Sequence, residues 1–235
     1  MKAIILAAGL GTRMKEVGKI IPKCLLKING KTMLERQFEL LNHVGIKKQD
    51  IYVVVGSQGD CWNETNYQKI KSIAPNIIVN PKNADLNQTY SFLMGINVLV
   101  KEKVLVLDGD LMITTNLIKS LISNQQKTTL LTQMPESENN LGNKVILNES
   151  KKIIHVTRQK INLPFSNYAG AFFIAAKDFD SFKNESKKEK YHHEDLGFIF
   201  DSLCKTNDFY VVNNEEWINI NTVSDLENAS SVIKS

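Results

Sequence analysis

The sequence predicts an α/β fold: a Rossmann-like, mostly parallel sheet flanked by helices, with a smaller β-rich lid or insertion in the second half. Helical and strand-like patterns alternate through the first half, which implies parallel strands joined by right-handed crossovers. Residues 104–107 are wholly apolar, as expected of a strand that helices cover on both faces. In the second half, short extended segments separated by polar turns replace this alternation.

The elements of the first half follow from hydrophobic periodicity. Leu34, Phe38, Leu41 and Val44 share one face of an amphipathic helix, so we expect that face to pack on the sheet. Short runs rich in Ile and Val predict the strands. The strands expected in this half are 3–8, 51–55, 76–80 and 104–107, and the helices are 32–44, 66–74 and 88–98.

The second half predicts further strands and helices without a break in composition. Thr222 and Ser224 are the candidate N-caps of the last helix. No repeat, low-complexity tract or linker divides the chain, so we expect one domain over residues 1–235. The extended segments expected here are 128–133, 144–147, 153–157, 169–175, 209–213 and 217–220, and the helices before the last one are 178–182 and 194–205.

Composition argues against several classes of protein. The net charge of +4 is too small and too scattered for a nucleic-acid-binding surface, whereas it suits a small anionic substrate. No apolar run approaches the about 18 residues that a membrane span needs, and the run after Met1 is too short for a signal-peptide core. Cys24, Cys61 and Cys204 are widely spaced, so we expect reduced thiols in a cytoplasmic protein.

The most informative segment is residues 3–23, AIILAAGLGTRMKEVGKIIPK, in which a short strand enters a turn of small residues. Gly9 and Gly11 let a ligand approach the main-chain N–H groups closely. Arg13 and Lys23 add positive charge for phosphate oxygens. We therefore expect a nucleoside-triphosphate cradle, and the alternative is a β-turn that binds no ligand.

Two common phosphate-binding motifs do not fit this segment. The dinucleotide fingerprint requires a third glycine where Met14 stands, and no acidic residue ends the next predicted strand. The P-loop pattern G-x-x-x-x-G-K-[ST] does not occur in the sequence.

Polar groups follow several predicted strands, at the sheet edge where open parallel sheets bind ligands. They are the turn at 7–13, Gly56-Ser57, residues 83–88 and Asp108-Gly109-Asp110. Because the carboxyl ends of parallel strands meet at one edge, these groups predict a single pocket.

Asp108 and Asp110 stand at the tip of an apolar strand, where two carboxylates are costly unless water or a cation meets them. Mg²⁺ favours one or two carboxylates together with substrate phosphates, so we expect a Mg²⁺ site with Asp110 as the direct ligand. The alternative is a plain β-turn, because Asp-Gly is common in turns.

Residues 83–88 supply amide and carboxylate groups just before a predicted helix. Asp85, Asn87 and Gln88 are suited to reading the edge of a base through hydrogen bonds. Capping of the helix is the alternative, and both roles are compatible.

Two later clusters also leave alternatives open. Asn219 and Asn221 lie on one face of a strand, which either points into the pocket or forms an exposed amide ladder. The run His-His-Glu-Asp at 192–195 lacks the ligand spacing of a zinc site. It fits either the acidic start of a helix or a substrate-facing role.

With these residues in hand, the chain resembles the sugar-nucleotide type, MobA-like nucleotidyltransferases over essentially its whole length. The match rests on residues 6–14, LAAGLGTRM, and on Pro22-Lys23. Residues 83–91 and 217–229 are more similar to the bacterial phosphocholine and aminoethylphosphonate cytidylyltransferases. The resemblance implies Mg²⁺-dependent transfer of CMP from CTP to a small phosphate monoester, with release of pyrophosphate, for the decoration of surface polysaccharides.

The resemblance also implies roles for individual residues. Arg13 and Lys23 are implied to be catalytic, with Lys23 bridging the α-phosphate and the incoming group, and Asp110 and Asn221 to hold the metal. The nucleotide-binding half is expected at 1–125, and the acceptor-binding lid with the closing strand and helix at 126–235. The residues implied to bind the nucleotide are Leu6, Ala7, Ala8, Gly9, Gly11, Thr12, Gly56, Asp85, Asn87, Ser91 and Asp108. Those expected to contact the acceptor are Tyr168, Glu194, Asp195 and Asn219.

The chain departs from the family in its closing segment. Members of the family often carry an acidic E-I-D-T pattern there, whereas this chain has Asn219 and Asn221. An amide oxygen can ligate Mg²⁺ but adds no net charge, so we expect the metal to arrive with the nucleotide.

The acceptor and the activity have alternatives. Tyr168, Tyr191 and Trp217 are candidates for an aromatic wall around a quaternary ammonium group. An aminoalkyl phosphonate, a hexose 1-phosphate and a phosphorylated amino acid are the other acceptors that we consider. A sugar-1-phosphate nucleotidyltransferase is the alternative enzyme. From another class, the Asn219/Asn221 pair favours a nucleotide-binding regulatory protein with weakened catalysis, and the oligomeric state stays open.

Overall fold

The computed structural model describes residues 1–134, 142–213 and 217–232. Its strands are β1 (Lys2–Leu6), β2 (Lys27–Ile28), β3 (Lys31–Thr32), β4 (Ile51–Gly56), β5 (Asn76–Asn80), β6 (Val104–Asp108), β7 (Leu111–Ile113), β8 (Thr129–Gln133), β9 (Lys144–Leu147), β10 (Ile153–Thr157), β11 (Ser166–Ile174), β12 (Tyr210–Asn213) and β13 (Trp217–Asn219). Its α-helices are α1 (Glu16–Ile20), α2 (Met33–His43), α3 (Glu64–Ile73), α4 (Gln88–Asn97), α5 (Thr115–Leu121), α6 (Phe179–Ser186), α7 (Gly197–Leu203) and α8 (Val223–Val232).

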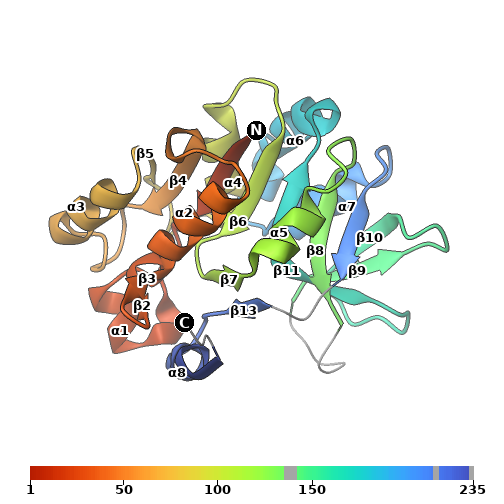
Figure 1. Ribbon diagram of the computed structural model, residues 1–235. Coiled ribbons are helices and arrows are strands. Elements are labelled where there is room, and N and C mark those ends of the chain that lie inside the picture. The colour runs from red at the N-terminus through yellow and green to blue at the C-terminus, as the bar shows by residue number, and fades with distance from the viewer. Residues whose placement is uncertain (135–141, 214–216, 233–235) are drawn as a thin grey trace.

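A nine-stranded sheet runs through the whole molecule (Figure 1). Strands β6, β1, β4 and β5 are parallel neighbours, which confirms the predicted α/β fold with a mostly parallel core. Strand β11 pairs antiparallel with β6, with Ala171 opposite Leu107, and it brings β8, β9 and β10 into the same sheet. The β-rich second half therefore extends the sheet edge instead of forming a separate layer above it.

Successive residues of β1 point to opposite faces of the sheet, and each face has its own core. Ala3 and Ile5 belong to a cluster with side chains of α2, α3 and α5. Ile4 and Leu6 belong to a second cluster with side chains of α4, α6 and α7. This alternation is the reason why the parallel strands are apolar throughout.

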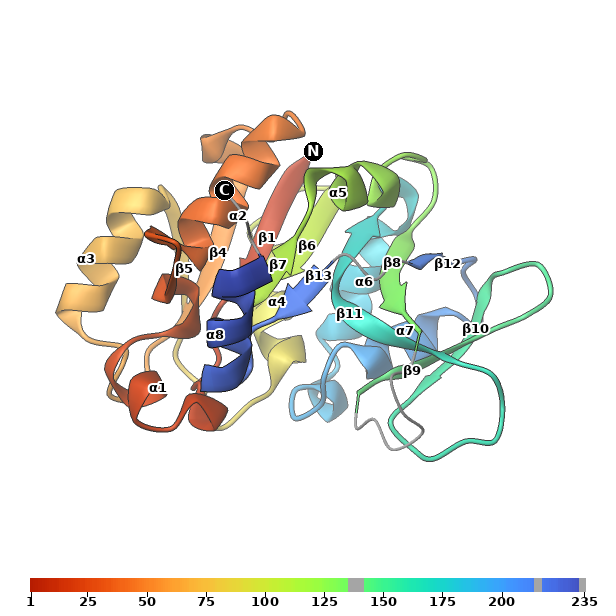
Figure 2. The same ribbon diagram turned by 60° about the horizontal axis from the view of Figure 1, so that its bottom comes forward.

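The C-terminal segment returns to the start of the chain. Strand β13 pairs with β7, with Asn219 opposite Leu111, and α8 follows directly (Figure 2). Thr222 is the N-cap of α8, because its Oγ1 accepts a hydrogen bond from Asp225 N at 3.2 Å. A third small core joins Ile220 and Ala229 to Met14 and its neighbours, so the closing helix packs on the segment that follows the glycine turn.

Several elements differ from the sequence-based expectation. The helix expected at 194–205 begins only at Gly197. A side chain at this position would clash with Asn143, because an added Cβ would lie 2.4 Å from Asn143 Oδ1. The strand expected at 169–175 begins at Ser166, because two polar residues, Ser166 and Asn167, are buried inside it. Helices α1 and α5, strand β7 and the β2–β3 hairpin were not predicted, since each is short and its pattern weak.

Replacement of Phe172 by Ala tests the core on the α4–α6–α7 face. Phe172 is fully buried, and its ring centroid lies 5.8 Å from that of Phe92 and 5.0 Å from that of Phe200. We expect Phe172→Ala to lower the free energy of unfolding by about 3–5 kcal/mol in urea titrations. Phe198→Ala removes a ring that is 39% exposed and serves as the matched control, with an expected loss of about 1 kcal/mol or less. Equal losses in the two variants would contradict the packing described here.

Candidate functional site

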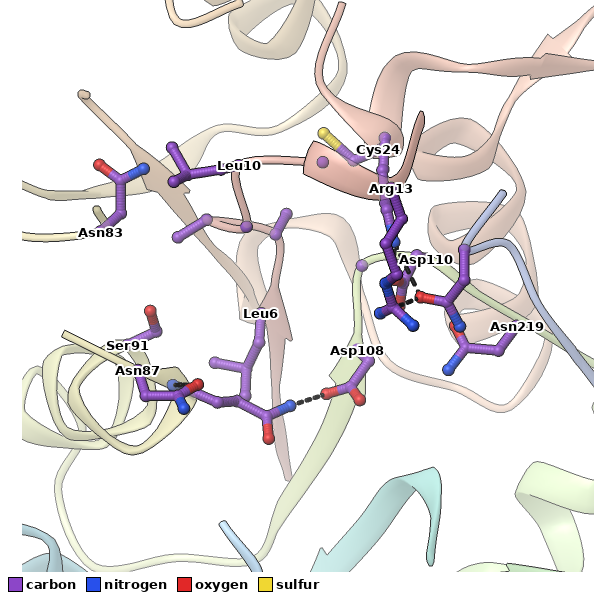
Figure 3. A pocket seen from close by; sticks show the side chains of 18 of the residues that line it. Leu6, Leu10, Arg13, Cys24, Asn83, Asn87, Ser91, Asp108, Asp110 and Asn219 are labelled. Carbon is purple, nitrogen blue, oxygen red and sulfur yellow. Dashed lines mark hydrogen bonds and ion pairs between the residues drawn. The ribbon is translucent and has the colours of Figure 1, made fainter. Parts of the chain in front are cut away.

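A cavity of about 710 Å³ lies at the carboxyl ends of β1 and β6 (Figure 3). One wall is the glycine turn after β1, and a second is the start of α4 together with the loop before it. The turn at 108–110 also lines the cavity, and residues of β8, β11 and β13 complete it from the second half of the chain.

The glycine turn is held in place by backbone hydrogen bonds from both sides. Ala7 N donates to Val54 O at 2.8 Å, and Gly109 N donates to Leu6 O at 2.8 Å. Gly11 has a φ of +66°, the left-handed conformation that glycine adopts readily. The turn is therefore fixed by its neighbours before any ligand binds.

Gly18 packs directly against this turn. A Cβ at Gly18 would lie 2.3 Å from Gly11 O and 3.1 Å from Met14 Cβ. Helix α1 thus packs directly against the turn, and only glycine fits at position 18. Nothing in the spacing of the sequence signalled this contact.

Two cationic side chains from the segment after the turn donate hydrogen bonds to Asp110 in the 108–110 turn and to Asn221, which follows β13. Lys23 Nζ donates to Asp110 Oδ2 at 2.8 Å and to Asn221 Oδ1 at 3.0 Å. Arg13 Nη2 donates to the same Asn221 oxygen at 2.6 Å. The side-chain amide nitrogen of Asn219 faces two oxygen atoms of Asp110. It donates to the backbone O at 3.0 Å and to Oδ1 at 2.9 Å.

Asp108 occupies a different environment from Asp110. Burial, and then the charge of Asp110, raise the pKa of the Asp108 carboxyl well above its ordinary value. Gln88 Nε2 donates to Asp108 Oδ1 at 2.5 Å, a contact visible in Figure 3, and this hydrogen bond opposes the shift. The two acids are therefore not equivalent, although the sequence presents them as a pair.

The asparagines near α4 order the wall beside Gly9. Asn83 Oδ1 accepts hydrogen bonds from Ser57 N at 2.9 Å and from Gln58 N at 2.8 Å. Asn87 is the N-cap of α4, and its Oδ1 accepts from Gln88 N at 2.7 Å. The amide groups at 83–88 thus hold the loop and the helix start together, and Asn87 performs the capping role that was one of the two predicted alternatives.

The cysteines are buried or half-buried free thiols. Cys24 lines the cavity, but burial raises the pKa of its thiol to about 12, so the thiol stays protonated. The three cysteines are free. In residues 1–134, 142–213 and 217–232, no group of three or more His, Cys, Asp or Glu side chains is placed to hold a metal ion.

The structure brings most of the predicted site residues together around the cavity. Those that line it are Leu6, Ala7, Ala8, Gly9, Gly11, Thr12, Arg13, Lys23, Asn87, Ser91, Asp108, Asp110, Tyr168, Asn219 and Asn221. Gln133 and Asn167 line it without having been predicted, because each stands alone in a strand with no motif around it.

Four predicted residues lie outside the cavity lining. Gly56 ends β4, where its carbonyl oxygen accepts a hydrogen bond from the Tyr67 hydroxyl. Asp85 is exposed, with Oδ2 3.4 Å from Gln58 Nε2. Glu194 offers its backbone oxygen to Thr89 N at 3.3 Å.

Asp195, the fourth, accepts a hydrogen bond from Gly197 N at 3.1 Å and forms an ion pair with Arg158 at 3.1 Å.

The predicted aromatic wall is not formed by Tyr191, which is buried and does not line the cavity. The side chain of Trp217, another candidate for this wall, lies outside the described residues.

Comparison with known proteins identifies the family. The profile of the MobA-like NTP transferase domain matches residues 3–159. The chain belongs to this family. The resemblance predicted from the sequence is therefore confirmed, and the turn that lines the cavity lies inside the matched segment.

Among curated relatives, the chain is 37% identical over 123 residues to a choline-phosphate cytidylyltransferase of Streptococcus pneumoniae, over 51% of this chain and 49% of that protein. It is 30% identical over 112 residues to a 2-aminoethylphosphonate cytidylyltransferase of Lancefieldella rimae, over 48% of this chain and 44% of that protein. The matches thus span about half of the length of these relatives.

A solved structure resembles the whole chain. It is the CTP:phosphocholine cytidylyltransferase LicC of Streptococcus pneumoniae, which aligns with a TM-score of 0.75 at 25% identity over 99% of each chain. None of the helices that the structure describes here has the length and apolarity to cross a bilayer.

Replacement of Gly18 by Ala tests the packing of α1 against the glycine turn. The added Cβ must displace the backbone of Gly11, so we expect affinity for a nucleoside triphosphate to fall at least about tenfold, with a loss of about 1–3 kcal/mol in stability. Lys19→Ala changes an exposed side chain of the same helix and is the control, with unchanged affinity expected. Titration calorimetry with each of the four nucleoside triphosphates measures the effect. Wild-type affinity in Gly18→Ala would show that the loop does not depend on this contact.

Proposed function

We propose that the protein is a Mg²⁺-dependent cytidylyltransferase, which transfers CMP from CTP to a small phosphate monoester and releases pyrophosphate. The observation that carries the proposal is the meeting of Arg13 and Lys23 with Asp110 and Asn221 beside the glycine turn. The names of the relatives, which act on choline phosphate and 2-aminoethylphosphonate, support CTP as donor and a phosphate or phosphonate as acceptor.

The walls of the cavity suggest how the substrates divide it. In this proposal the triphosphate lies along the turn at 7–12, where main-chain N–H groups and Arg13 face its oxygens. The cytosine lies beside Gly9 toward Asn87 and Ser91, and the acceptor enters from the side of β8 and β11. The nucleotide half is then 1–125 and the acceptor half 126–235.

Two of the residues that line the cavity beside the glycine turn fit a divalent cation. Asp110 contributes a carboxylate and Asn221 an amide oxygen, and both are hard oxygen donors of the kind that Mg²⁺ prefers. A cationic group, the Lys23 ammonium, already lies 2.8 Å from Asp110 Oδ2. When bound, Mg²⁺ would neutralise charge on the triphosphate oxygens.

The reaction requires positioning more than covalent chemistry. A phosphate oxygen of the acceptor attacks the α-phosphorus in line with the bond to the β-phosphate, and that bond breaks as pyrophosphate leaves. Lys23 reaches both the α-phosphate and the acceptor phosphate, so its charge offsets their repulsion. Arg13 holds the leaving pyrophosphate. We place this activity in the cytoplasm, in the supply of activated groups for surface polysaccharides.

Replacement of Lys23 by Ala tests the assignment of the charge. We expect pyrophosphate release from CTP to fall at least about a hundredfold, because one stabilising contact in the transition state is lost, while CTP binding stays measurable. Lys27→Ala removes an exposed lysine of the same segment and is the matched control. The assay uses all four nucleoside triphosphates with choline phosphate, 2-aminoethylphosphonate and glucose 1-phosphate. An unchanged rate in Lys23→Ala would remove this lysine from the mechanism, and binding without turnover in the wild type would favour a regulatory role.

The order of binding between metal and nucleotide is a separate prediction. The Lys23 ammonium neutralises the charge of Asp110, and Asn219 and Asn221 are neutral. We therefore expect calorimetry to show weak Mg²⁺ binding to the protein alone. A non-hydrolysable CTP analogue should raise the Mg²⁺ affinity at least about tenfold. Asn221→Asp adds a carboxylate, so Mg²⁺ affinity without nucleotide should rise. Asn124→Asp places the same charge on an exposed turn as a control. Tight Mg²⁺ binding to the wild-type protein without nucleotide would contradict the predicted order.

A further inference from the structure

The segment at 192–195 lies against the first turn of α4, and its backbone oxygens accept hydrogen bonds from that turn. Asn87 N donates to His192 O at 2.8 Å, and Thr89 N donates to Glu194 O at 3.3 Å. The side-chain Nδ2 of Asn87 also donates to the backbone oxygen between these two, at 3.3 Å. Among the described residues that line the cavity, none belongs to 192–195. The segment therefore contacts the start of α4 through its backbone and sends no side chain into the cavity lining.

The N–H groups at the start of α4 all have partners within the protein. The first N–H groups of a helix find no acceptor inside that helix, and free groups of this kind often bind phosphate. Here Gln88 N donates to Asn87 Oδ1 at 2.7 Å, and Tyr90 N donates to Asn87 O at 3.1 Å. Thr89 N is taken by Glu194 O. The start of α4 is thus a fixed wall and not a phosphate site, which leaves the phosphate role to the glycine turn.

His192 connects the ends of two helices. Its ring Nε2 donates to Ser186 O, the last residue of α6, at 3.1 Å. The same ring packs edge-on against Tyr90 of α4, with the ring centroids 5.2 Å apart. Its backbone oxygen accepts from Asn87 N. One residue therefore satisfies a carbonyl at the end of α6 and an N–H at the start of α4, and it holds the two ends together.

The turn that carries His192 is anchored in the second half of the chain. Glu185 of α6 is only 7% exposed, and its carboxylate accepts hydrogen bonds from Lys188 Nζ and from Ser202 Oγ of α7, each at 2.7 Å. Tyr191 is buried, and its N donates to Lys188 O at 3.0 Å. Helices α6 and α7 thus form a fixed support from which His192 reaches α4.

The first turns of α4 also carry groups that line the cavity. Asn87, Gln88 and Ser91 belong to its lining, and Figure 3 shows Asn87 and Ser91 on one side of it. Gln88 Nε2 donates to Asp108 Oδ1 at 2.5 Å. Because these groups follow one another along a single helix start, a shift of that start displaces all of them together.

We propose that His192 is a positioning residue for the nucleotide. It holds the start of α4, and with it Asn87 and Ser91, where the cytosine is proposed to bind. His192 acts through α4 and does not itself line the cavity. It lies in the half at 126–235 that the sequence assigned to the acceptor, so both halves of the chain build the wall for the nucleotide. This inference rests on the proposed binding of CTP beside α4, and it adds the residue that fixes this wall.

Replacement of His192 separates positioning from a purely structural role. His192→Ala loses the bond to Ser186 O and the contact with Tyr90, so we expect KM for CTP to rise at least about tenfold while KM for choline phosphate changes less than about twofold. His192→Gln keeps an amide N–H near the place of Nε2 and should return KM for CTP to within about threefold of the wild-type value. His43→Ala is the control, because it removes another ring bonded to a helix carbonyl, that of Glu39 at 2.7 Å, away from the cavity lining.

Hydrogen exchange reports on α4 without any ligand. The amides of Asn87 and Thr89 should exchange at least about tenfold faster in His192→Ala than in the wild-type protein, and His192→Gln should restore their protection. Should His192→Ala not fold, His192→Asn takes its place, because its amide is one methylene shorter than that of Gln and does not reach Ser186 O. Titration calorimetry with the four nucleoside triphosphates measures affinity independently of turnover.

The outcomes distinguish this inference from the proposed function. Unchanged KM for CTP in His192→Ala, equal rises in KM for CTP and for the acceptor, or failure of His192→Gln to restore nucleotide affinity would overturn the role of His192 and leave the cytidylyltransferase proposal intact. Nucleotide binding without pyrophosphate release in the wild type would instead refute the proposed transfer, and the calorimetric comparison would still decide the role of His192. Absence of binding of every nucleoside triphosphate to the wild-type protein would overturn both.

Discussion

The arrangement of the site depends on a charge balance among residues that line the cavity. Two cations of the same segment, Arg13 and Lys23, share the amide oxygen of Asn221, and Lys23 also pairs with Asp110. The protein's own oxygen atoms therefore hold these cations where a triphosphate would need them. In the proposed reaction, a polyphosphate would compete for both cations, and Asp110 and Asn221 are the residues that would then hold a metal ion.

This balance ties the first residues of the chain to the last ones described. Arg13 and Asn221 are 208 positions apart, and their contact exists because Ile220 and Ala229 pack with Met14 in one small core. The backbone of the closing segment is fixed as well, since Ile220 N donates to Asp110 O at 2.9 Å. The C-terminal helix therefore supports the site, although none of its side chains described up to Ala229 lines the cavity.

The sequence predicted the wall built from the first half of the chain more fully than the wall built from the second half. The turn at 7–13 and the pair Asp108 and Asp110 were predictable, because a parallel sheet brings the ends of its strands to one edge and the motif is local. Asn167 was not, because it reaches the cavity only when β11 joins the antiparallel edge of the sheet beside β6. Gly18 was missed for a similar reason, since its close approach to Gly11 depends on how α1 packs back against the turn.

The difference between the two sides has a physical origin that bears on specificity. The wall built from the first half of the chain consists of main-chain groups and a few fixed charges. On the opposite side, single side chains from β8, β11 and β13 line the cavity, and each can change without moving the strand that carries it. Under the proposed function, substitution at positions such as 133, 167 and 168 would therefore alter which acceptor is used, while the charge balance around Lys23 would continue to serve the same transfer.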